Sequence, residues 1–217
     1  MEDFDSYDNE AELQSVYSPS HSTKSNLTLV DIPEDNGTKA GNIHYDFVSY
    51  PEYNGFQRSH TPKQDWSGFS KLNMFLKADG SDHKFVVQVN AGGVTFEAYP
   101  KIDGTDGHVV SLNFGDADGN GGDFAPASWD TAHAGMKLSQ KLLSKVGSFA
   151  LYINDNGGNR PKSGDLTLDS IKLDGKRDAY APNTNPTPGN TAKAQSVDDF
   201  SGYSDDAAAQ SALGATA

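Results

Sequence analysis

The chain has 217 residues, with 17 Lys and Arg against 30 Asp and Glu, a net charge of −13, and no cysteine. The negative charge disfavours nucleic acid and anionic membranes as partners, because both would repel it. The missing cysteine excludes a disulfide scaffold and a thiolate metal site. No run of about 18 apolar residues could span a bilayer, and the acidic N-terminus is unlike a signal peptide. We therefore expect a soluble protein with a neutral ligand, whose signal peptide lies outside this chain.

Short apolar runs with period-two alternation predict strands from residue 27 onward. Glycine-containing turn clusters such as Asp79-Gly80 and Gly157-Gly158 separate them. This number of short strands predicts an all-β fold, a jelly-roll β-sandwich of two antiparallel sheets. We expect one helix of one or two turns near 139–145. The predicted strands are 27–30, 43–47, 56–60, 72–76, 85–89, 93–99, 108–114, 148–153 and 165–173.

The C-terminal part of the chain has the composition of a linker followed by a repeat. Residues 176–195 lose apolar periodicity and carry three prolines among Asn, Thr and Gly, which is typical of an extended linker. The later segment Asp199-Phe-Ser-Gly-Tyr203 repeats Asp3-Phe-Asp-Ser-Tyr7, although chance similarity in a polar tail is the alternative. We predict a sandwich over 1–175, a linker over 176–195, and the truncated start of a second similar module over 196–217, with the C-terminal tail disordered.

Four motifs in a fixed order carry a family resemblance. They are Glu2-Asp-Phe-Asp-Ser-Tyr7, Gln64-Asp-Trp-Ser-Gly-Phe69, Val146-Gly-Ser-Phe-Ala-Leu-Tyr-Ile153 and Leu166-Thr-Leu-Asp-Ser-Ile-Lys-Leu173. Each motif alone is loose, but together they resemble the β-sandwich carbohydrate-binding modules of families 11, 23 and 27. The resemblance covers about residues 2–175. The stretch 124–135 looks closest to the mannan-binding family 23, whose members are appended to β-mannanases.

The resemblance implies a non-catalytic module that binds soluble β-mannan chains (mannan, galactomannan, glucomannan) and targets an attached glycoside hydrolase to them. It also implies an extracellular protein, secreted or attached to the cell surface, that is monomeric. Family 11 resembles the sequence almost as well, so mixed-linkage β-glucan is the alternative ligand. A protein-binding adhesion module and a small jelly-roll glycosidase are further alternatives. The glycosidase would need two facing carboxylates, and the sequence shows no paired-glutamate face and no hydrolase motif.

A neutral polysaccharide offers apolar C–H faces and hydroxyl groups, so its site needs exposed aromatic rings and hydrogen-bonding side chains. Alternation puts Phe56, Arg58 and His60 on one side of a strand, and we interpret this unusual set as facing the ligand. The alternative is a core Phe56 beside two residues on a solvated edge. Gln88 and Asn90 share the face opposite to the core residues of their own strand.

The remaining candidates come from later strands and one loop. Glu97 extends the polar face, and Tyr152 and Asn154 lie opposite core positions. Trp129 has few apolar neighbours in sequence and is assigned to the site, whereas Trp66 precedes a core strand and is assigned to packing. No catalytic residue is predicted. The full predicted binding set is Tyr53, Phe56, Arg58, His60, Gln88, Asn90, Glu97, Trp129, Tyr152 and Asn154.

Acidic residues near the two ends of the predicted sandwich raise the question of structural calcium. Glu2 and Asp3 begin the first strand and Asp169 lies on the last. The resemblance implies that these ends pair and share a calcium ion, which prefers oxygen ligands; solvated carboxylates are the alternative. The segment from Asp116 to Gly121 matches the first half of a calcium-binding loop. It has Ala127 in place of the closing Glu, so we interpret it as a glycine-rich turn.

Overall fold

The computed structural model describes residues 2–19, 26–31, 39–102 and 104–182. One compact unit spans Met1–Ala181 and therefore continues past the predicted boundary at residue 175. The backbone N–H of Tyr180 donates to the Ser67 hydroxyl (2.8 Å), and Arg177 Nε donates to the Ser67 carbonyl (3.1 Å), which holds this extension in place. The predicted second module and the part of the predicted linker from residue 183 onward lie outside the described residues.

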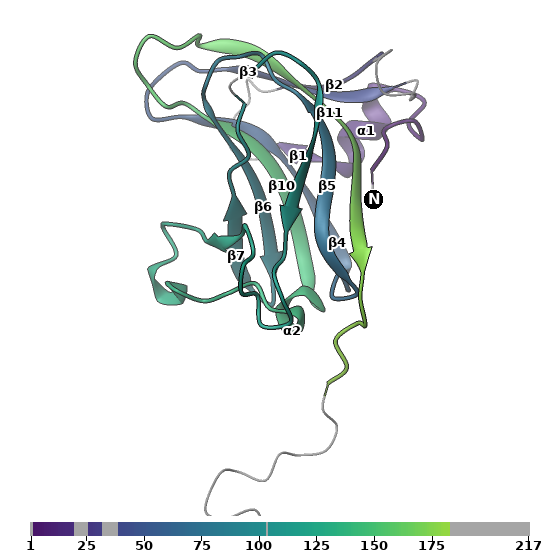
Figure 1. Ribbon diagram of the computed structural model, residues 1–217. Coiled ribbons are helices and arrows are strands. Elements are labelled where there is room, and N and C mark those ends of the chain that lie inside the picture. Colours follow the sequence, from purple (N-terminus) through teal and green to yellow (C-terminus); the bar gives the residue numbers. More distant parts are fainter. Residues whose placement is uncertain (1, 20–25, 32–38, 103, 183–217) are drawn as a thin grey trace, which may run out of the picture. The chain divides into compact units, whose positions relative to one another are not determined.

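Two antiparallel sheets form the unit and confirm the predicted jelly-roll β-sandwich (Figure 1). Some neighbouring strands are consecutive, such as β6 and β7, whereas others, such as β4 and β10, come from distant parts of the chain. The six-stranded sheet has the order β1 (Ser18–Pro19), β4 (Tyr53–Gln64), β10 (Val146–Asn154), β6 (Lys84–Ala91), β7 (Val94–Ala98) and β9 (Ala125–Pro126). The five-stranded sheet has the order β2 (Asn26–Val30), β3 (Ala40–Asp46), β11 (Ser163–Lys176), β5 (Phe69–Lys77) and β8 (His108–Asn113).

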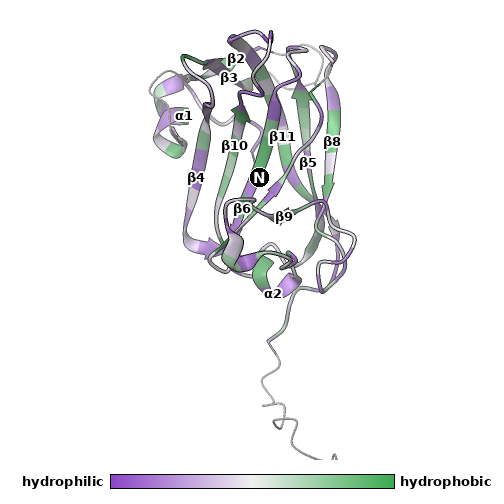
Figure 2. Ribbon diagram, turned by 90° about the vertical axis from the view of Figure 1, so that its left-hand side faces the viewer, coloured by the Kyte–Doolittle hydropathy of each residue, from purple (hydrophilic) through white to green (hydrophobic). Residues whose placement is uncertain are grey.

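The core lies between the two sheets and takes every second residue of the central strands. On β6, Phe85, Val87 and Val89 are buried in the main apolar cluster, as the alternation predicted. Figure 2 shows that β10, at the centre of its sheet, is largely apolar, whereas β4 beside it is largely hydrophilic. The Trp66 ring lies 6.4 Å from the Phe114 ring and is also buried in this cluster, which confirms its predicted packing role.

Two α-helices occur among the described residues, and only one was expected. The helix α2 (Gln140–Leu143) confirms the prediction near 139–145. The helix α1 (Glu10–Val16) was missed, although Asn9 and Glu12 form a capping pattern: Asn9 Oδ1 accepts from the Glu12 backbone N–H (3.1 Å), and Glu12 Oε2 accepts from the Asp8 backbone N–H (2.9 Å). No helix in the described ranges is long and apolar enough to cross a membrane.

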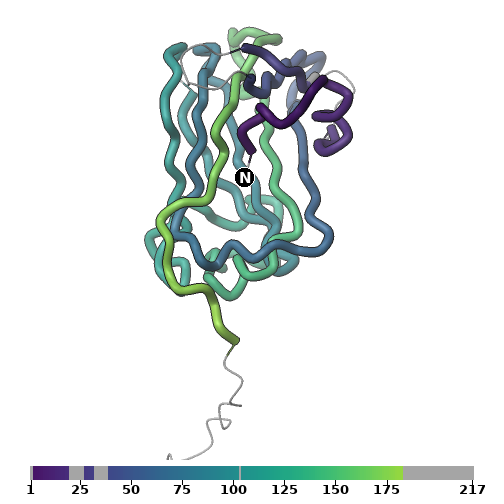
Figure 3. Tube along the Cα trace, turned by 90° about the vertical axis from the view of Figure 1, so that its right-hand side faces the viewer, coloured from purple at the N-terminus to yellow at the C-terminus, as the bar shows by residue number. Residues whose placement is uncertain are grey.

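The N-terminal segment lies against the last strand of the sandwich (Figure 3). Glu2 and Ile171 of β11 form an antiparallel bridge and exchange two backbone hydrogen bonds of 2.8 Å each. This pairing carries the Glu2 side chain to the interior, where it is 6% exposed. The first and last elements of the unit are therefore joined directly.

Candidate functional site

A cavity of about 560 Å³ opens on the outer face of the six-stranded sheet. Its volume falls in the range of about 300–1,000 Å³ that is typical of small-molecule sites. Four strands and one loop contribute to it, and the wall combines aromatic rings with amide, ammonium and carboxylate groups. The lining residues are Tyr53, Gln57, Lys84, Gln88, Glu97, Ser128, Trp129, Ala150, Tyr152 and Asn154.

The register of the strands arranges these side chains in rows that run across the sheet. Asn154 of β10 pairs with Tyr53 on β4 and with Lys84 on β6, which gives one row. Gln88 of β6 pairs with Ala150 on one side and with Glu97 on the other, which gives a second row. The cavity therefore extends perpendicular to the strands, from β4 toward the edge strand β9.

A hydrogen-bond cluster around Glu97 organises the centre of the cavity. The Tyr152 hydroxyl donates to Glu97 Oε1 (2.6 Å), and the Tyr99 hydroxyl donates to Oε2 (2.6 Å). Gln88 Nε2 donates to Glu97 Oε1 (3.0 Å) and to the Tyr152 hydroxyl oxygen (2.6 Å). Burial, reinforced by the hydrogen bond to Glu97, raises the pKa of both tyrosines well above the ordinary value. Both hydroxyls are therefore protonated donors that hold their rings in fixed positions.

The aromatic surfaces around this cluster differ in exposure. The Tyr53 and Tyr152 rings pack at 5.5 Å between centroids, and Lys84 Nζ lies 3.5 Å from the centroid of the Tyr99 ring. Trp129 lies in the loop between β9 and the 3₁₀ helix η2 (Thr131–His133) and is 66% exposed. Tyr53 is half-buried and Tyr152 is only 8% exposed. Trp129 is therefore the ring best placed to stack on a sugar, while the fixed polar groups nearby are suited to hydrogen-bond its hydroxyls.

One acceptor of the cavity is left open within the protein. The Oδ1 atom of Asn154 is buried and accepts no hydrogen bond within the described part of the chain. A buried acceptor without a partner is costly, and most such groups find one in a protein, water or ligand. Asn154 lines the cavity, but Oδ1 has almost no exposed surface, so a ligand hydroxyl could donate to it only if the side chain turned toward the cavity.

The position of Tyr152 depends on a close approach of two strands at Gly55. A Cβ atom at residue 55 would lie 2.1 Å from Tyr152 Cβ and 2.2 Å from the Leu151 carbonyl oxygen. We therefore expect Gly55→Ala to lower the free energy of unfolding by about 1–3 kcal/mol and to displace the Tyr152 ring. Gly104→Ala is the matched control, because a Cβ there meets no heavy atom of the described residues within 4 Å. Equal thermal unfolding midpoints for the two variants would contradict this expectation.

Six of the ten predicted binding residues line this cavity: Tyr53, Gln88, Glu97, Trp129, Tyr152 and Asn154. A seventh, Asn90, follows on the same face of β6, where its Nδ2 donates to Thr95 Oγ1 (3.2 Å). The sequence interpretation missed Gln57, Lys84 and Ser128. Gln57 and Lys84 could have been found, because they share the alternation phase of Tyr53 and Gln88 respectively.

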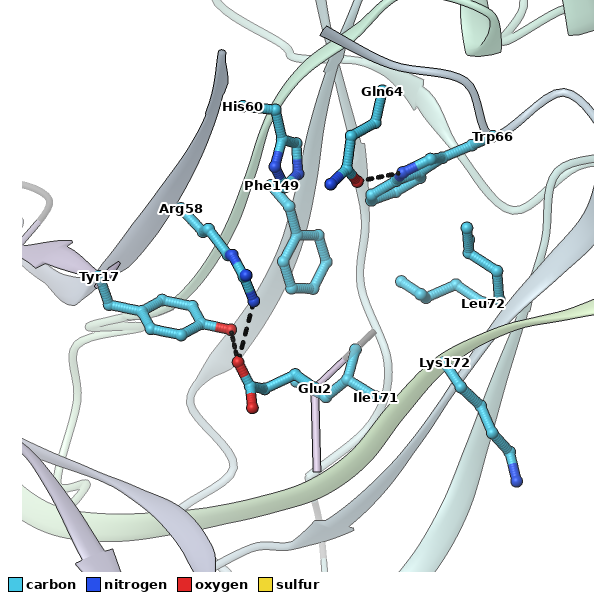
Figure 4. A pocket seen from close by; sticks show the side chains of 11 residues that line it. Glu2, Tyr17, Arg58, His60, Gln64, Trp66, Leu72, Phe149, Ile171 and Lys172 are labelled. Atoms are coloured by element: carbon cyan, nitrogen blue, oxygen red, sulfur yellow. Dashed lines mark hydrogen bonds and ion pairs between the residues drawn. The ribbon is translucent and has the colours of Figure 1, made fainter. Parts of the chain in front are cut away.

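The prediction that Phe56, Arg58 and His60 face the ligand is wrong. They do share one side of β4, but it is the inner side: Phe56 is in the core and Arg58 Nη1 donates to Glu2 Oε2 (3.0 Å) (Figure 4). The His60 ring lies 6.0 Å from the Trp66 ring at 61°, and burial, with Arg58 nearby, lowers the His60 pKa. Arg58 can face inward because Glu2 of the N-terminal segment supplies a buried carboxylate as its partner. The periodicity of β4 alone does not reveal this partner.

Glu2 accepts four hydrogen bonds in this interior position. Its Oε1 accepts from the Phe4 backbone N–H (3.0 Å), and its Oε2 accepts from the hydroxyls of Tyr7 (2.8 Å) and Tyr17 (3.1 Å) and from Arg58 (3.0 Å). Figure 4 shows the Tyr17 and Arg58 contacts converging on one carboxylate oxygen. Burial, followed by the nearby Glu2 carboxylate, raises the pKa of both tyrosines. The carboxylate thus ties the N-terminal segment to β4.

The calcium site predicted on Glu2, Asp3 and Asp169 does not fit these contacts. Both oxygens of Glu2 accept protein donors, one of them the cationic Arg58, whose charge would repel a divalent ion. Across the part of the chain that the structure describes, no three His, Asp or Glu side chains form a group that could hold a metal ion. In the loop that resembles half a calcium site, Asp116 Oδ1 accepts the backbone N–H of Asn120 (2.8 Å), which agrees with the interpretation as a turn.

No family model matches the chain. The chain is 99% identical over 214 residues to a mannan endo-1,4-β-mannosidase of Bifidobacterium adolescentis, a match that covers 99% of this chain and 21% of that protein. The chain therefore spans about a fifth of the length of this relative.

Solved structures of similar fold come from carbohydrate-active proteins. The family 11 carbohydrate-binding module of a cellulosomal cellulase of Clostridium thermocellum has a TM-score of 0.57 at 16% identity, covering 83% of this chain and 96% of that chain. The same organism's family 11 module in complex with a β-1,3-1,4-mixed-linked tetrasaccharide has a TM-score of 0.54 at 17% identity, covering 81% and 94%. An exo-β-agarase has a TM-score of 0.56 at 15% identity, covering 82% of this chain and 25% of that chain. The chain thus has the β-sandwich fold of family 11 carbohydrate-binding modules and matches a segment of a longer mannan endo-1,4-β-mannosidase.

Proposed function

We propose that this chain is a non-catalytic module that binds β-mannan on the outer face of its six-stranded sheet and targets an attached mannanase to that polysaccharide. The observation that carries the proposal is the cavity in which the exposed Trp129 and the half-buried Tyr53 lie beside the Glu97 hydrogen-bond cluster. The match to a segment of a mannan endo-1,4-β-mannosidase supports mannan as the ligand.

Binding of this kind combines stacking with hydrogen bonds that replace bonds to water. Each stacked ring contributes about 1 kcal/mol and each hydroxyl hydrogen bond adds about 1 kcal/mol or less, so affinity in the micromolar range is expected. Tethering to a catalytic domain turns this modest affinity into a high local concentration of enzyme on its substrate.

The single carboxylate of the cavity favours binding over hydrolysis. Among the residues that line it, Glu97 is the only acidic one, and both of its oxygens already accept hydrogen bonds. A glycosidase usually needs two carboxyl groups about 5–10 Å apart on either side of the scissile bond. The cavity therefore has the residues to hold a sugar chain but lacks the pair that would cleave it.

Calorimetric titration with mannohexaose, cellohexaose and a mixed-linkage glucan hexasaccharide tests the proposed ligand. We expect mannohexaose to bind most tightly. Preference for the mixed-linkage sugar would identify a β-glucan-binding module instead, which is the alternative that the family 11 fold supports. Absence of heat with all three sugars would overturn the carbohydrate-binding proposal.

Trp129→Ala tests whether the Trp129 ring stacks on the bound sugar. Because Trp129 is 66% exposed, we expect the thermal unfolding midpoint to stay unchanged while mannohexaose binds about five- to tenfold more weakly. Tyr50→Ala is the matched control, since Tyr50 is equally exposed at 65% but does not line the cavity. Equal losses of affinity in both variants would argue against Trp129 as a stacking residue.

The resemblance to carbohydrate-binding modules also supports a proposal about the location, oligomeric state and neighbouring module of this chain. We propose an extracellular, monomeric module, either secreted or attached to the cell surface, with a second similar module starting at 196–217 after a linker. The repeat of the Asp3–Tyr7 motif at Asp199–Tyr203 supports the second module. A chain extended beyond Ala217 that binds mannan polysaccharide more tightly than residues 1–181 would support this arrangement through avidity.

A further inference from the structure

We propose that the binding site continues past the edge strand β9 into a second cavity, which holds further sugar residues of the same polysaccharide chain. This inference rests on the proposed function and adds a second compartment to the site. The second cavity has a volume of about 470 Å³. It is formed by the glycine-rich loop 119–122, by β9 with its flanking residues, and by the segment from Ser128 to Lys137.

The position of the second cavity matches the direction of the first. The rows of side chains on the outer face run across β4, β10, β6 and β7, and β9 is the last strand on that side of the sheet. The second cavity is lined by β9 and by the loops beyond it. Ser128 lines both cavities, so they meet at this residue. A linear chain lying along the rows would reach the second cavity over Ser128.

The wall of the second cavity has the same mixture of groups as the first. Phe124, Pro126 and Met136 supply apolar surface, and Met136 is 40% exposed. Asp130 supplies a carboxylate that is already oriented, because both its oxygens lie 2.8 Å from His133 Nδ1. Such a wall suits the C–H faces and hydroxyls of a neutral sugar.

The glycine-rich loop forms a fixed part of this wall. A Cβ atom at Gly119 would lie 2.8 Å from the Leu138 carbonyl carbon, and one at Gly122 would lie 2.8 Å from the Phe114 carbonyl oxygen. The loop therefore packs directly on neighbouring backbone. A wall held in this way is formed before the ligand arrives, which lowers the cost of ordering on binding.

The methionine methyl groups provide a direct test of occupancy. With 13C-methyl methionine, we expect a mannan octasaccharide to shift the NMR signal of Met136 and a tetrasaccharide, confined to the first cavity, to leave it in place. Met74 is fully buried in the core and serves as the internal control. An octasaccharide that binds without moving the Met136 signal would overturn the second cavity. Failure of the tetrasaccharide to bind at all would instead overturn the proposed function itself.

A pair of alanine substitutions tests the same inference by affinity. Ala134 is exposed and lines the second cavity, whereas Ala132 of η2 is also exposed but does not line it. We expect Ala134→Leu to reduce octasaccharide affinity by about fivefold while leaving tetrasaccharide affinity unchanged, and Ala132→Leu to change neither. An octasaccharide also gains affinity because it can place different groups of its sugars in the site. This statistical gain is the same in all variants and cancels when they are compared. An unchanged ratio of octasaccharide to tetrasaccharide affinity in Ala134→Leu would contradict the inference.

Discussion

Replacing Glu97 with alanine is expected to weaken mannohexaose binding by about a hundredfold, or about 2.8 kcal/mol. The substitution removes the acceptor of the Tyr152 and Tyr99 hydroxyls and of the Gln88 amide. The Tyr152 hydroxyl, whose residue is 8% exposed, would be left buried without an acceptor, at a cost of about 1–3 kcal/mol. Gln88 keeps its bond to the Tyr152 hydroxyl oxygen, and Tyr99 is exposed enough to reach water. We expect the rings to rotate away from the binding position to find new partners. Calorimetric titration measures the loss.

Two further variants separate this effect from a general loss of charge or of folding. Glu97→Gln keeps one acceptor oxygen, and we expect it to bind with intermediate affinity. Asp106→Ala removes an exposed carboxylate far from the cavity in sequence and outside its lining, and we expect it to bind as the parent does. A Glu97→Ala variant that is folded by circular dichroism and keeps full affinity would show that the cluster does not organise the site.

Replacing Glu2 with alanine is expected to produce the largest loss of stability. The change leaves Arg58 and two tyrosine hydroxyls without their common acceptor in the interior. Breaking a fully buried ion pair costs about 3–5 kcal/mol, but the Arg58 side chain is 31% exposed, so we expect about 2–3 kcal/mol. For a unit of this size the thermal unfolding midpoint should fall by about 4–12 °C. Differential scanning calorimetry measures it.

The neighbouring residue offers the control for Glu2. Asp3 is exposed, so Asp3→Ala should leave the midpoint unchanged. Calcium chelation should also leave it unchanged, because the two oxygens of Glu2 are occupied by protein donors. If chelation lowered the midpoint of the parent, and Asp3→Ala without chelator lowered it by the same amount, the two results would support the calcium site. They would refute the arrangement held by hydrogen bonds alone.

Strand alternation predicted the site residues on those strands where a run of alternate apolar residues identified the side facing the core. On β6, the run of Phe85, Val87 and Val89 marks the inner face, so Gln88 had to point outward. On β4 no such run exists: alternation grouped Phe56 with Arg58 correctly but did not say which side they face. The deciding contact is with Glu2, far away in sequence, and a local pattern carries no information about it.

The loops were less predictable than the strands, for a similar reason. Trp129 could be proposed for the site because its sequence neighbours are small, whereas Ser128 gave no signal, since its role depends on where β9 places the loop. Helix α1 was missed despite its Asn9 and Glu12 cap, because its apolar face contributes a single buried side chain, Leu13. Short elements with so little buried surface leave no periodicity to detect.

The cavity draws its wall from strands that are brought together only by the complete fold, from Tyr53 on β4 to Asn154 on β10. No single strand or loop contains the site, whose lining residues are spread over 53–154, so a sugar that occupies it binds the folded state alone. Ligand at about a hundred times its dissociation constant would then add about 2.7 kcal/mol to the free energy of unfolding. Bound to a polysaccharide as proposed, the unit would be harder to open by heat or by proteases than it is in free solution, and it would lose this protection once the polysaccharide had been degraded.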